Sequence, residues 1–254
     1  MENRVRDAWR QNQCAINGWL CVPSAFSAEL MMQTECDSLC IDLQHGLIDY
    51  RDAVVMMQAM DVRRVSPLVR VPWNEPGIIM KCLDAGAIGI VCPMVNTRAD
   101  AEQFVSACRY PPLGIRSSGP VRAQLVYGDE YQADANTGVI AFAQIETAQA
   151  LDNLESILAV PGLDAVYIGS SDLAISMGYV PGIERSEPQL LEAIDHILER
   201  SKYHRVRAAI HCSGPAHAKR MMGKGFDLVT ALTDSRLILQ GGKQAMAELR
   251  SQGQ

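Results

Sequence analysis

The chain has 254 residues and a formal net charge of −6, with 48% apolar and 20% charged residues. This composition is ordinary for a globular protein and excludes a largely disordered chain. The mildly acidic balance, without a basic cluster, argues against nucleic acid or an anionic membrane as a partner.

Targeting signals and cysteine usage indicate the compartment. No stretch reaches the roughly 18 consecutive apolar residues of a transmembrane helix, and residues 1–7 are charged and lack the apolar core of a signal peptide. The eight cysteines are scattered and form no Cys-x-x-Cys pair, so we expect reduced thiols rather than disulfides or a zinc site. We therefore expect a cytoplasmic protein.

Eight candidate strands follow one another along the chain, and several are continuous apolar runs. Parallel strands that helices cover on both faces have this pattern. The predicted strands are residues 16–22, 38–43, 67–71, 89–94, 139–146, 165–170, 206–212 and 227–232.

Amphipathic segments with capping signals lie between these strands. Asp49 precedes an apolar-periodic run to Met60, and Pro76 opens a run that stops at Gly86. Further helices are predicted over residues 98–108, 148–158 and 187–203. A C-terminal helix begins at Asp234, and a second helical stretch is expected after residues 241–242.

Eight β-then-α units in about 250 residues predict a single α/β domain, a (β/α)8 TIM barrel over residues 1–254 with an extra C-terminal helix. A doubly wound open sheet is the alternative, but the Gly-rich phosphate turn it requires after the first strand is absent. Residues 110–138 form a connection longer than the roughly 12–15 residues usual in loops. We expect this connection to be ordered by contacts of Arg116, Arg122, Tyr127 and Tyr131.

Two carboxylates fall at the C-terminal ends of neighbouring strands, where such barrels carry their active sites. Gln144 and Glu146 are two residues apart on the fifth strand, so their side chains share a face. Asp172 follows the sixth strand, and adjacent strands lie about 4.8 Å apart. We expect Glu146 and Asp172 to share one divalent cation, with Mg²⁺ or Mn²⁺ favoured by the oxygen ligands. The alternative is that Asp172 caps a helix and Glu146 pairs with a cationic side chain.

Three further polar residues follow strand ends. Arg70 either stabilises negative charge on a substrate oxygen or forms a structural ion pair with Glu146 or Asp42. His45 lies just beyond the second strand, a position suited to acid–base chemistry. His211, on the seventh strand, points either into the core or into the site.

Seven short blocks occur in the order typical of one enzyme family. They are residues 41–46, 69–72 with Asn74, 81–87, 93–95, 110–112 with 114–116, 144–147, and 168–169 with 171–173. With them the chain resembles the metal-dependent class II pyruvate aldolases of the 4-hydroxy-2-oxoheptanedioate aldolase type, and more distantly the citrate lyase β-chains and macrophomate synthase. The resemblance covers nearly the whole chain and implies the same barrel fold.

The resemblance implies roles for the candidate residues. Glu146 and Asp172 would bind one divalent cation (Mg²⁺, Mn²⁺ or Co²⁺), without an organic cofactor. Arg70 would polarise the keto oxygen, and His45, paired with Asp84, would act as acid and base. The substrate-binding residues would be Gln144, Gly169, Ser170, Ser171 and Asp42, with the main chain around residues 169–172 holding the pyruvate carboxylate.

The resemblance also implies a homo-hexamer in which the last helix packs on a neighbouring subunit. Gln44 stands where many family members carry Glu, a departure that affects the local charge or the accepted aldehyde. The implied reaction is the reversible cleavage of a 4-hydroxy-2-oxo acid to pyruvate, or a related 2-keto acid, and an aldehyde.

The residues themselves support this reaction. A cation that chelates a 2-keto acid acts as a Lewis acid and makes the protons beside the keto group removable, so an enolate can form. No lysine is placed at a strand end for a Schiff base, which disfavours a class I aldolase. The alternatives are a 2-oxo acid decarboxylase, a CoA-thioester lyase on the same scaffold, and a non-catalytic binding protein.

Overall fold

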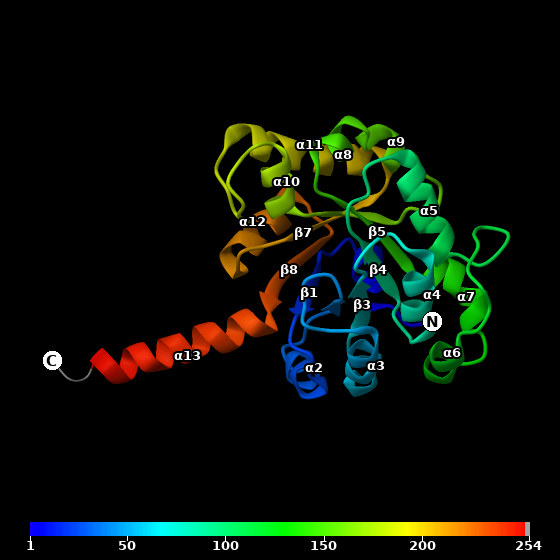
Figure 1. Cartoon of the computed structure of the whole chain (residues 1–254), viewed down its shortest axis with the longest axis horizontal. Helices are drawn as coiled ribbons and strands as arrows, with labels where there is room; N and C mark the ends of the chain where they lie inside the picture. Colours follow the sequence, from blue (N-terminus) through cyan, green and yellow to red (C-terminus); the bar gives the residue numbers. More distant parts are fainter. Residues whose placement is uncertain (252–254) are drawn as a thin grey trace.

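The computed structural model describes residues 1–251, which contain a closed barrel of eight parallel strands (Figure 1). The strands pair in chain order, and β8 pairs with β1 to close the barrel. Their bounds are β1 (Ala15–Leu20), β2 (Ser38–Asp42), β3 (Ser66–Arg70), β4 (Gly89–Cys92), β5 (Ile140–Ile145), β6 (Ala165–Ile168), β7 (Arg207–His211) and β8 (Leu228–Thr233). The eight predicted strands are confirmed, with ends that differ by at most two residues.

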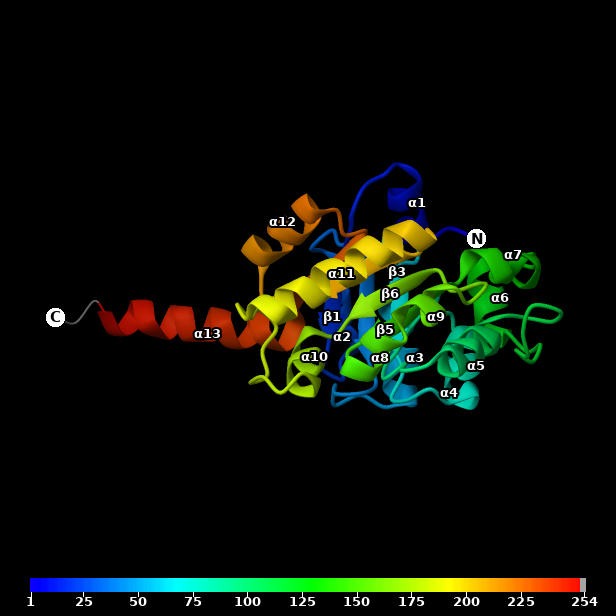
Figure 2. The same ribbon diagram turned by 90° about the horizontal axis from the view of Figure 1, so that it is seen from above.

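Helices connect the strands and surround the barrel (Figures 1 and 2). They are α1 (Arg4–Arg10), α2 (Ala25–Met32), α3 (Tyr50–Ala59), α4 (Pro76–Asp84), α5 (Arg98–Cys108), α6 (Val121–Tyr127), α7 (Tyr131–Gly138), α8 (Ala148–Asp152), α9 (Leu154–Leu158), α10 (Ser170–Ser176), α11 (Pro188–His204), α12 (Pro215–Lys224) and α13 (Asp234–Ser251). Asp49 caps α3 in a reciprocal capping box with Asp52. Gly86 follows the end of α4 and has a φ of 109°, a conformation that favours glycine.

The apolar core has two layers. One lies between the strands and the surrounding helices, and the other fills the inside of the barrel. At the N-terminal end of the barrel, α1 covers this interior, and Trp9 packs edge-on against Phe142 with ring centroids 6.0 Å apart. The sequence analysis did not predict α1, whose seven residues include three arginines.

Three segments depart from the predicted helices. The helix predicted over residues 148–158 is divided at Asn153 into α8 and α9. The stretch expected after residues 241–242 is not separate, because α13 continues through both glycines. The long connection is ordered, as predicted, and contains α6 and α7; Arg116 within it is fully buried.

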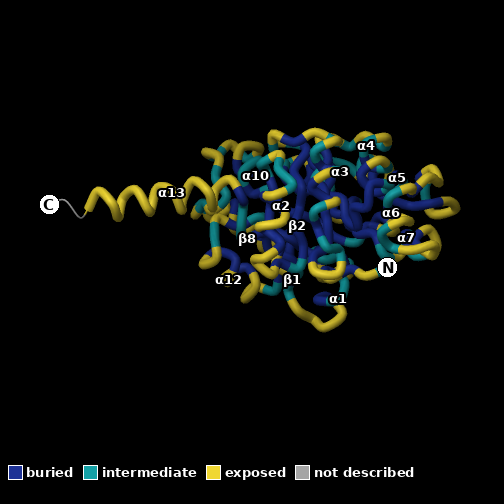
Figure 3. Tube along the Cα trace, turned by 90° about the horizontal axis from the view of Figure 1, so that it is seen from below, coloured by how far each residue is buried: buried dark blue, intermediate teal, exposed yellow. Residues whose placement is uncertain are grey.

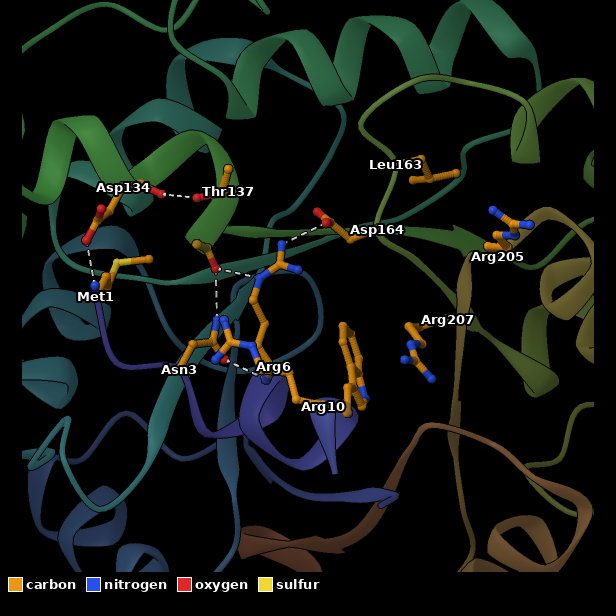
Figure 4. A pocket seen from close by; sticks show the side chains of 12 residues that line it. Met1, Asn3, Arg6, Arg10, Asp134, Thr137, Leu163, Asp164, Arg205 and Arg207 are labelled. Carbon is orange, nitrogen blue, oxygen red and sulfur yellow. Dashed lines mark hydrogen bonds and ion pairs between the residues drawn. The ribbon is translucent and has the colours of Figure 1, made fainter. Parts of the chain in front are cut away.

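A cavity of about 490 Å³ lies at the N-terminal end of the barrel beside α1 (Figure 4). Arginines that line this cavity form hydrogen bonds and ion pairs with neighbouring residues of the protein. Arg6 donates to the carbonyl of Val139 and to Asp164, at 2.8 and 2.7 Å, and Arg207 pairs with Asp227 at 2.7 Å. These contacts tie the N-terminal segment to the starts of β5 to β7, so we interpret this end of the barrel as structural.

Helix α13 follows β8 and projects away from the barrel (Figure 2), exposed along its length (Figure 3). Only Asp234 of this helix is buried; its carboxylate accepts hydrogen bonds from the amides of Cys21 and Val22 and from the Ser27 hydroxyl. The helix nevertheless carries large apolar side chains, namely Leu237, Ile238, Leu239, Met246 and Leu249. Within residues 1–251, the helices fall short of the length and apolarity needed to cross a bilayer.

Candidate active site

A pocket of about 330 Å³ opens at the C-terminal ends of the strands. Eight of the ten predicted site residues line it, Glu146 lies directly behind Gln144, and Asp84 is elsewhere. The lining residues are Trp19, Cys21, Asp42, His45, Arg70, Gln144, Tyr167, Gly169, Ser170, Ser171, Asp172, Ile183, His211, Thr233, Ser235 and Arg236.

Arg70 is held in the pocket by a two-pronged ion pair with Asp42. Its Nε and Nη2 donate to the two carboxylate oxygens at 2.9 and 2.6 Å, and its guanidinium lies 4.9 Å from the centre of the Trp19 ring. Of the two ion pairs considered for Arg70, the structure contains the one with Asp42. Such a bidentate contact fixes the plane of the guanidinium.

Asp42 itself is fully engaged by protein groups. It also accepts hydrogen bonds from Trp19 Nε1 at 3.1 Å and from the amides of Gln44 and His45. Burial acts to raise the pKa of Asp42, but the hydrogen bonds and the charge of Arg70 outweigh it and the pKa is lowered. The carboxylate therefore orients Arg70. Asp42 also lines the pocket, and its direct contact with substrate, which the resemblance implies, stays a prediction.

Glu146 is a buried carboxylate without a cationic partner among residues 1–251. Its oxygens accept hydrogen bonds from the Met94 amide, at 2.7 Å, and from Gln144 Nε2. Burial raises the pKa of Glu146 to about 7, and the nearby charge of Asp172 raises it further against the effect of these hydrogen bonds. The charge of Arg70 lowers this pKa only in part, so ionised Glu146 would be stabilised by a positive charge in direct contact, which residues 1–251 do not supply.

The junction between β6 and α10 brings Asp172 toward Glu146. A Cβ atom at Gly169 would lie 2.8 Å from Gln144 Nε2 and closer still to a Glu146 oxygen, so only glycine fits beside the two side chains. The helix then begins at Ser170 and carries Asp172 in its first turn. Asp172 accepts no hydrogen bond from residues 1–251, and so differs from a simple helix cap.

The residues around Glu146 fit a divalent cation. Gln144 Oε1 and Ser170 Oγ are buried and have no hydrogen-bond partner in residues 1–251, and carboxylate and amide oxygens are the donors that Mg²⁺ and Mn²⁺ prefer. Within the same residues, no three His, Cys, Asp or Glu side chains are close enough to hold a metal ion together. Glu146 and Asp172 would thus supply two ligands, and water or substrate would complete the set.

His45 and Asp84 lie at different ends of the barrel. His45 is exposed in the loop after β2. Asp84 ends α4, and because a helix that follows a barrel strand runs back along it, this position is at the N-terminal end of the barrel. There Asp84 accepts a hydrogen bond from the buried Arg116 at 2.7 Å, and Arg116 also donates to Tyr131. The predicted His45–Asp84 pair therefore does not form within one chain.

The structure adds pocket residues that the sequence analysis did not assign, namely Trp19, Tyr167, His211 and Arg236. His211 points into the site, and its Nδ1 lies 3.2 Å from the Tyr167 hydroxyl. Burial, together with the charge of Arg70, lowers the pKa of His211 to about 3. The position of Trp19 near the C-terminal end of β1 could have indicated its place in the pocket, whereas Arg236, on an exposed helix, gave no such signal.

Comparison with known proteins finds relatives that match nearly the whole chain. The family model of HpcH/HpaI aldolase/citrate lyase matches residues 18–239. The chain is 40% identical over 249 residues to a hydroxypyruvate/pyruvate aldolase of Rhizorhabdus wittichii, which covers 98% of this chain and 99% of the relative. It is 32% identical over 234 residues to a 5-keto-4-deoxy-D-glucarate aldolase of Escherichia coli, with 91% of each chain covered.

Solved structures are similar over the same length. An HpcH/HpaI aldolase/citrate lyase family protein of Burkholderia cenocepacia matches with a TM-score of 0.90 at 30% identity, and the match covers 98% of this chain and 100% of that one. Macrophomate synthase has the same fold, with a TM-score of 0.86 at 24% identity and with 99% and 90% of the two chains covered.

Proposed function

The chain belongs to the HpcH/HpaI aldolase/citrate lyase family, and we propose that it is a divalent-metal-dependent aldolase whose donor is pyruvate or a related 2-keto acid. It reversibly cleaves a 4-hydroxy-2-oxo acid to that 2-keto acid and an aldehyde. The observation that carries this proposal is the buried carboxylate of Glu146, which has no ion-pair partner in residues 1–251 and lies near Asp172 behind a pocket that also contains Arg70. The relative named hydroxypyruvate/pyruvate aldolase supports this class of donor over the decarboxylase, thioester lyase and binding-protein alternatives.

Glu146 and Asp172 would hold one divalent cation, Mg²⁺, Mn²⁺ or Co²⁺, with Gln144 beside them. When bound, the cation supplies Lewis-acid polarisation of the keto group of the substrate. The raised pKa of Glu146 supports this assignment, because a cation would compensate the ionised carboxylate that burial disfavours.

Arg70 stabilises the negative charge that develops on the keto oxygen of the substrate. The contact with Asp42 uses Nε and Nη2, so Nη1 is left for a substrate oxygen, and the orientation is set before the substrate binds. At the start of α10, Ser170 Oγ has no partner in residues 1–251. With the main chain of residues 169–171, Ser170 would hold the carboxylate of the 2-keto acid.

His45 takes the proton from the C4 hydroxyl in the cleavage direction and returns it during addition. Asp84 lies at the other end of its own barrel, so a role at His45 requires Asp84 of a second copy. The proposed homo-oligomer, a hexamer, would supply such a copy, and the exposed apolar side chains of α13 support association. Eight free cysteines support a reducing compartment, the cytoplasm.

Hydrogen–deuterium exchange at the methyl group of pyruvate tests the proposal, because it requires no knowledge of the aldehyde. EDTA-treated protein in D₂O is compared by NMR with protein that has received Mg²⁺, Mn²⁺ or Co²⁺. We expect exchange that depends on the metal and is lost in Asp172→Ala. Folded protein without exchange under any of the three metals would contradict the proposal, and full exchange in Asp172→Ala would remove Asp172 from the metal site.

A further inference from the structure

His211 lines the pocket at the end of β7, the strand beside β6, but has no part in the proposed chemistry. We propose that His211 determines specificity, its Nε2 forming a hydrogen bond with a hydroxyl group that the substrate carries on a reacting carbon or on the carbon next to it. This rests on the proposed function and narrows the substrates to hydroxylated 2-keto acids or hydroxylated aldehydes over their alkyl analogues.

The position of His211 brings its ring close to the reacting groups. His211 ends β7 and lines the same pocket as Arg70 and Asp172. Its ring packs edge-on against Trp19 with centroids 5.2 Å apart, and the guanidinium of Arg70 lies 4.9 Å from the centre of the Trp19 ring. The imidazole and the group that contacts the keto oxygen therefore share one aromatic side chain as their support.

A buried hydrogen-bond chain fixes the orientation of the imidazole. Its Nδ1 lies 3.2 Å from the Tyr167 hydroxyl, which is itself 2.7 Å from Thr230 Oγ1. Thr230 Oγ1 accepts from Asn17 Nδ2 at 2.9 Å, and Asn17 Oδ1 accepts from Ser38 Oγ at 2.8 Å. Because this chain runs through the inside of the barrel and engages Nδ1, the other ring nitrogen is the one available to a ligand.

Nε2 is open to the pocket and forms no hydrogen bond with residues 1–251. Burial and the nearby Arg70 keep the imidazole neutral, so it has one donor and one acceptor nitrogen. If Tyr167 donates to Nδ1, Nε2 carries the proton and donates; if Nδ1 donates to Tyr167, Nε2 accepts. A hydroxyl group can both accept and donate a hydrogen bond, so it fits Nε2 in either arrangement of the protons along the hydrogen-bond chain.

An alkyl group in the same place would leave Nε2 without a partner. A desolvated polar atom in a binding site needs a hydrogen-bond partner, so the site discriminates strongly against an analogue that lacks one. This discrimination is larger than the difference in affinity by which an apolar pocket separates ligands of similar shape. The hydroxyl group belongs either to the 2-keto acid or to the aldehyde, and two pairs of near-isosteric substrates separate these sources. Hydroxypyruvate is compared with 2-oxobutanoate as donor, and glycolaldehyde with propionaldehyde as acceptor for pyruvate.

The test measures kcat/KM for both pairs in the unmodified enzyme, in His211→Leu and in His211→Gln. We expect the unmodified enzyme to prefer the hydroxylated member of one pair, and His211→Leu to lower that preference by about tenfold, the effect of one lost hydrogen bond. His211→Gln, whose amide both donates and accepts, should restore part of it. His217→Leu is the matched control, because His217 is also buried but lies outside this pocket.

Each outcome has a separate meaning. A changed donor ratio assigns the hydroxyl group to the 2-keto acid, and a changed acceptor ratio assigns it to the aldehyde. If His211→Leu lowers kcat/KM equally for both members of each pair, the specificity role is overturned. It is also overturned if His211→Leu keeps full activity with unchanged ratios, and Nε2 then binds only water. Absence of metal-dependent pyruvate exchange in the unmodified protein would instead overturn the proposed function, and this role with it.

Discussion

Glu146→Gln should change how the stability of the metal-free protein depends on pH. In the absence of a bound cation, Glu146 has no ion-pair partner in residues 1–251, and burial raises its pKa to about 7 from an ordinary value of 4.5. The amide of glutamine keeps an acceptor for the Met94 amide and removes the titration. The comparison therefore isolates the cost of the buried charge.

The sign follows from which state keeps the proton. Below pH 4.5 both states are protonated and the stabilising contribution is complete, whereas between pH 4.5 and 7 the unfolded chain ionises and the folded chain does not. Stability therefore falls as the pH rises through this range and levels off above pH 7. At 1.36 kcal/mol per pH unit the whole effect is about 3.4 kcal/mol, of which about 2.5 kcal/mol falls between pH 5 and pH 8.

Urea unfolding at pH 5 and pH 8, with EDTA and at one protein concentration, measures this effect. The free energy of unfolding of the unmodified protein should fall relative to Glu146→Gln by about 2.5 kcal/mol. Glu192→Gln removes the same charge from an exposed position of α11 and should follow the unmodified protein. A difference between the unmodified protein and Glu146→Gln that is the same at both pH values would refute the reasoning.

Three further substitutions test other parts of the site and the fold. Arg70→Lys should lower kcat at least tenfold, because an ammonium group cannot reproduce the two-pronged contact with Asp42; a near-normal kcat in steady-state kinetics would remove Arg70 from the catalytic residues. His45→Ala should slow aldol cleavage much more than methyl exchange of pyruvate, whereas equal losses in the two assays would show that His45 is not the base for the C4 hydroxyl. Arg116→Ala leaves Asp84 without its cation, and chemical denaturation should show a loss of about 3 kcal/mol; unchanged stability would mean that the pair contributes little.

Most of the fold could be predicted from the sequence because buried parallel strands leave a local signal. Residues 140–145 are a run of apolar residues interrupted only by Gln144, a pattern typical of parallel strands that are buried on both faces. Capping signals are equally local, as Asp49 and Gly86 show. The two-helix form of residues 148–158 was missed because Asn153 interrupts the helix without proline or glycine.

The candidate site was predictable to the extent that position along a strand determines direction. Glu146 and Asp172 follow neighbouring strands, and the order of the strands brings these strand ends together. The partner of Asp84 was not predictable in this way, because Arg116 lies in a long connection whose path depends on tertiary contacts. The direction of His211 was left open for a related reason: its neighbours, Tyr167 and Trp19, come from strands far away in the chain.

Helix α13 connects the wall of the pocket to an exposed surface far from the barrel. Ser235 and Arg236 line the pocket one and two residues beyond the anchored Asp234, while the 18 residues of the helix extend about 27 Å from that anchor at 1.5 Å per residue. A rotation of about 5° about Asp234 would therefore displace the far end of the helix by about 2 Å. Immobilising the far end of α13 would, by the same geometry, fix Ser235 and Arg236 to a small fraction of that distance.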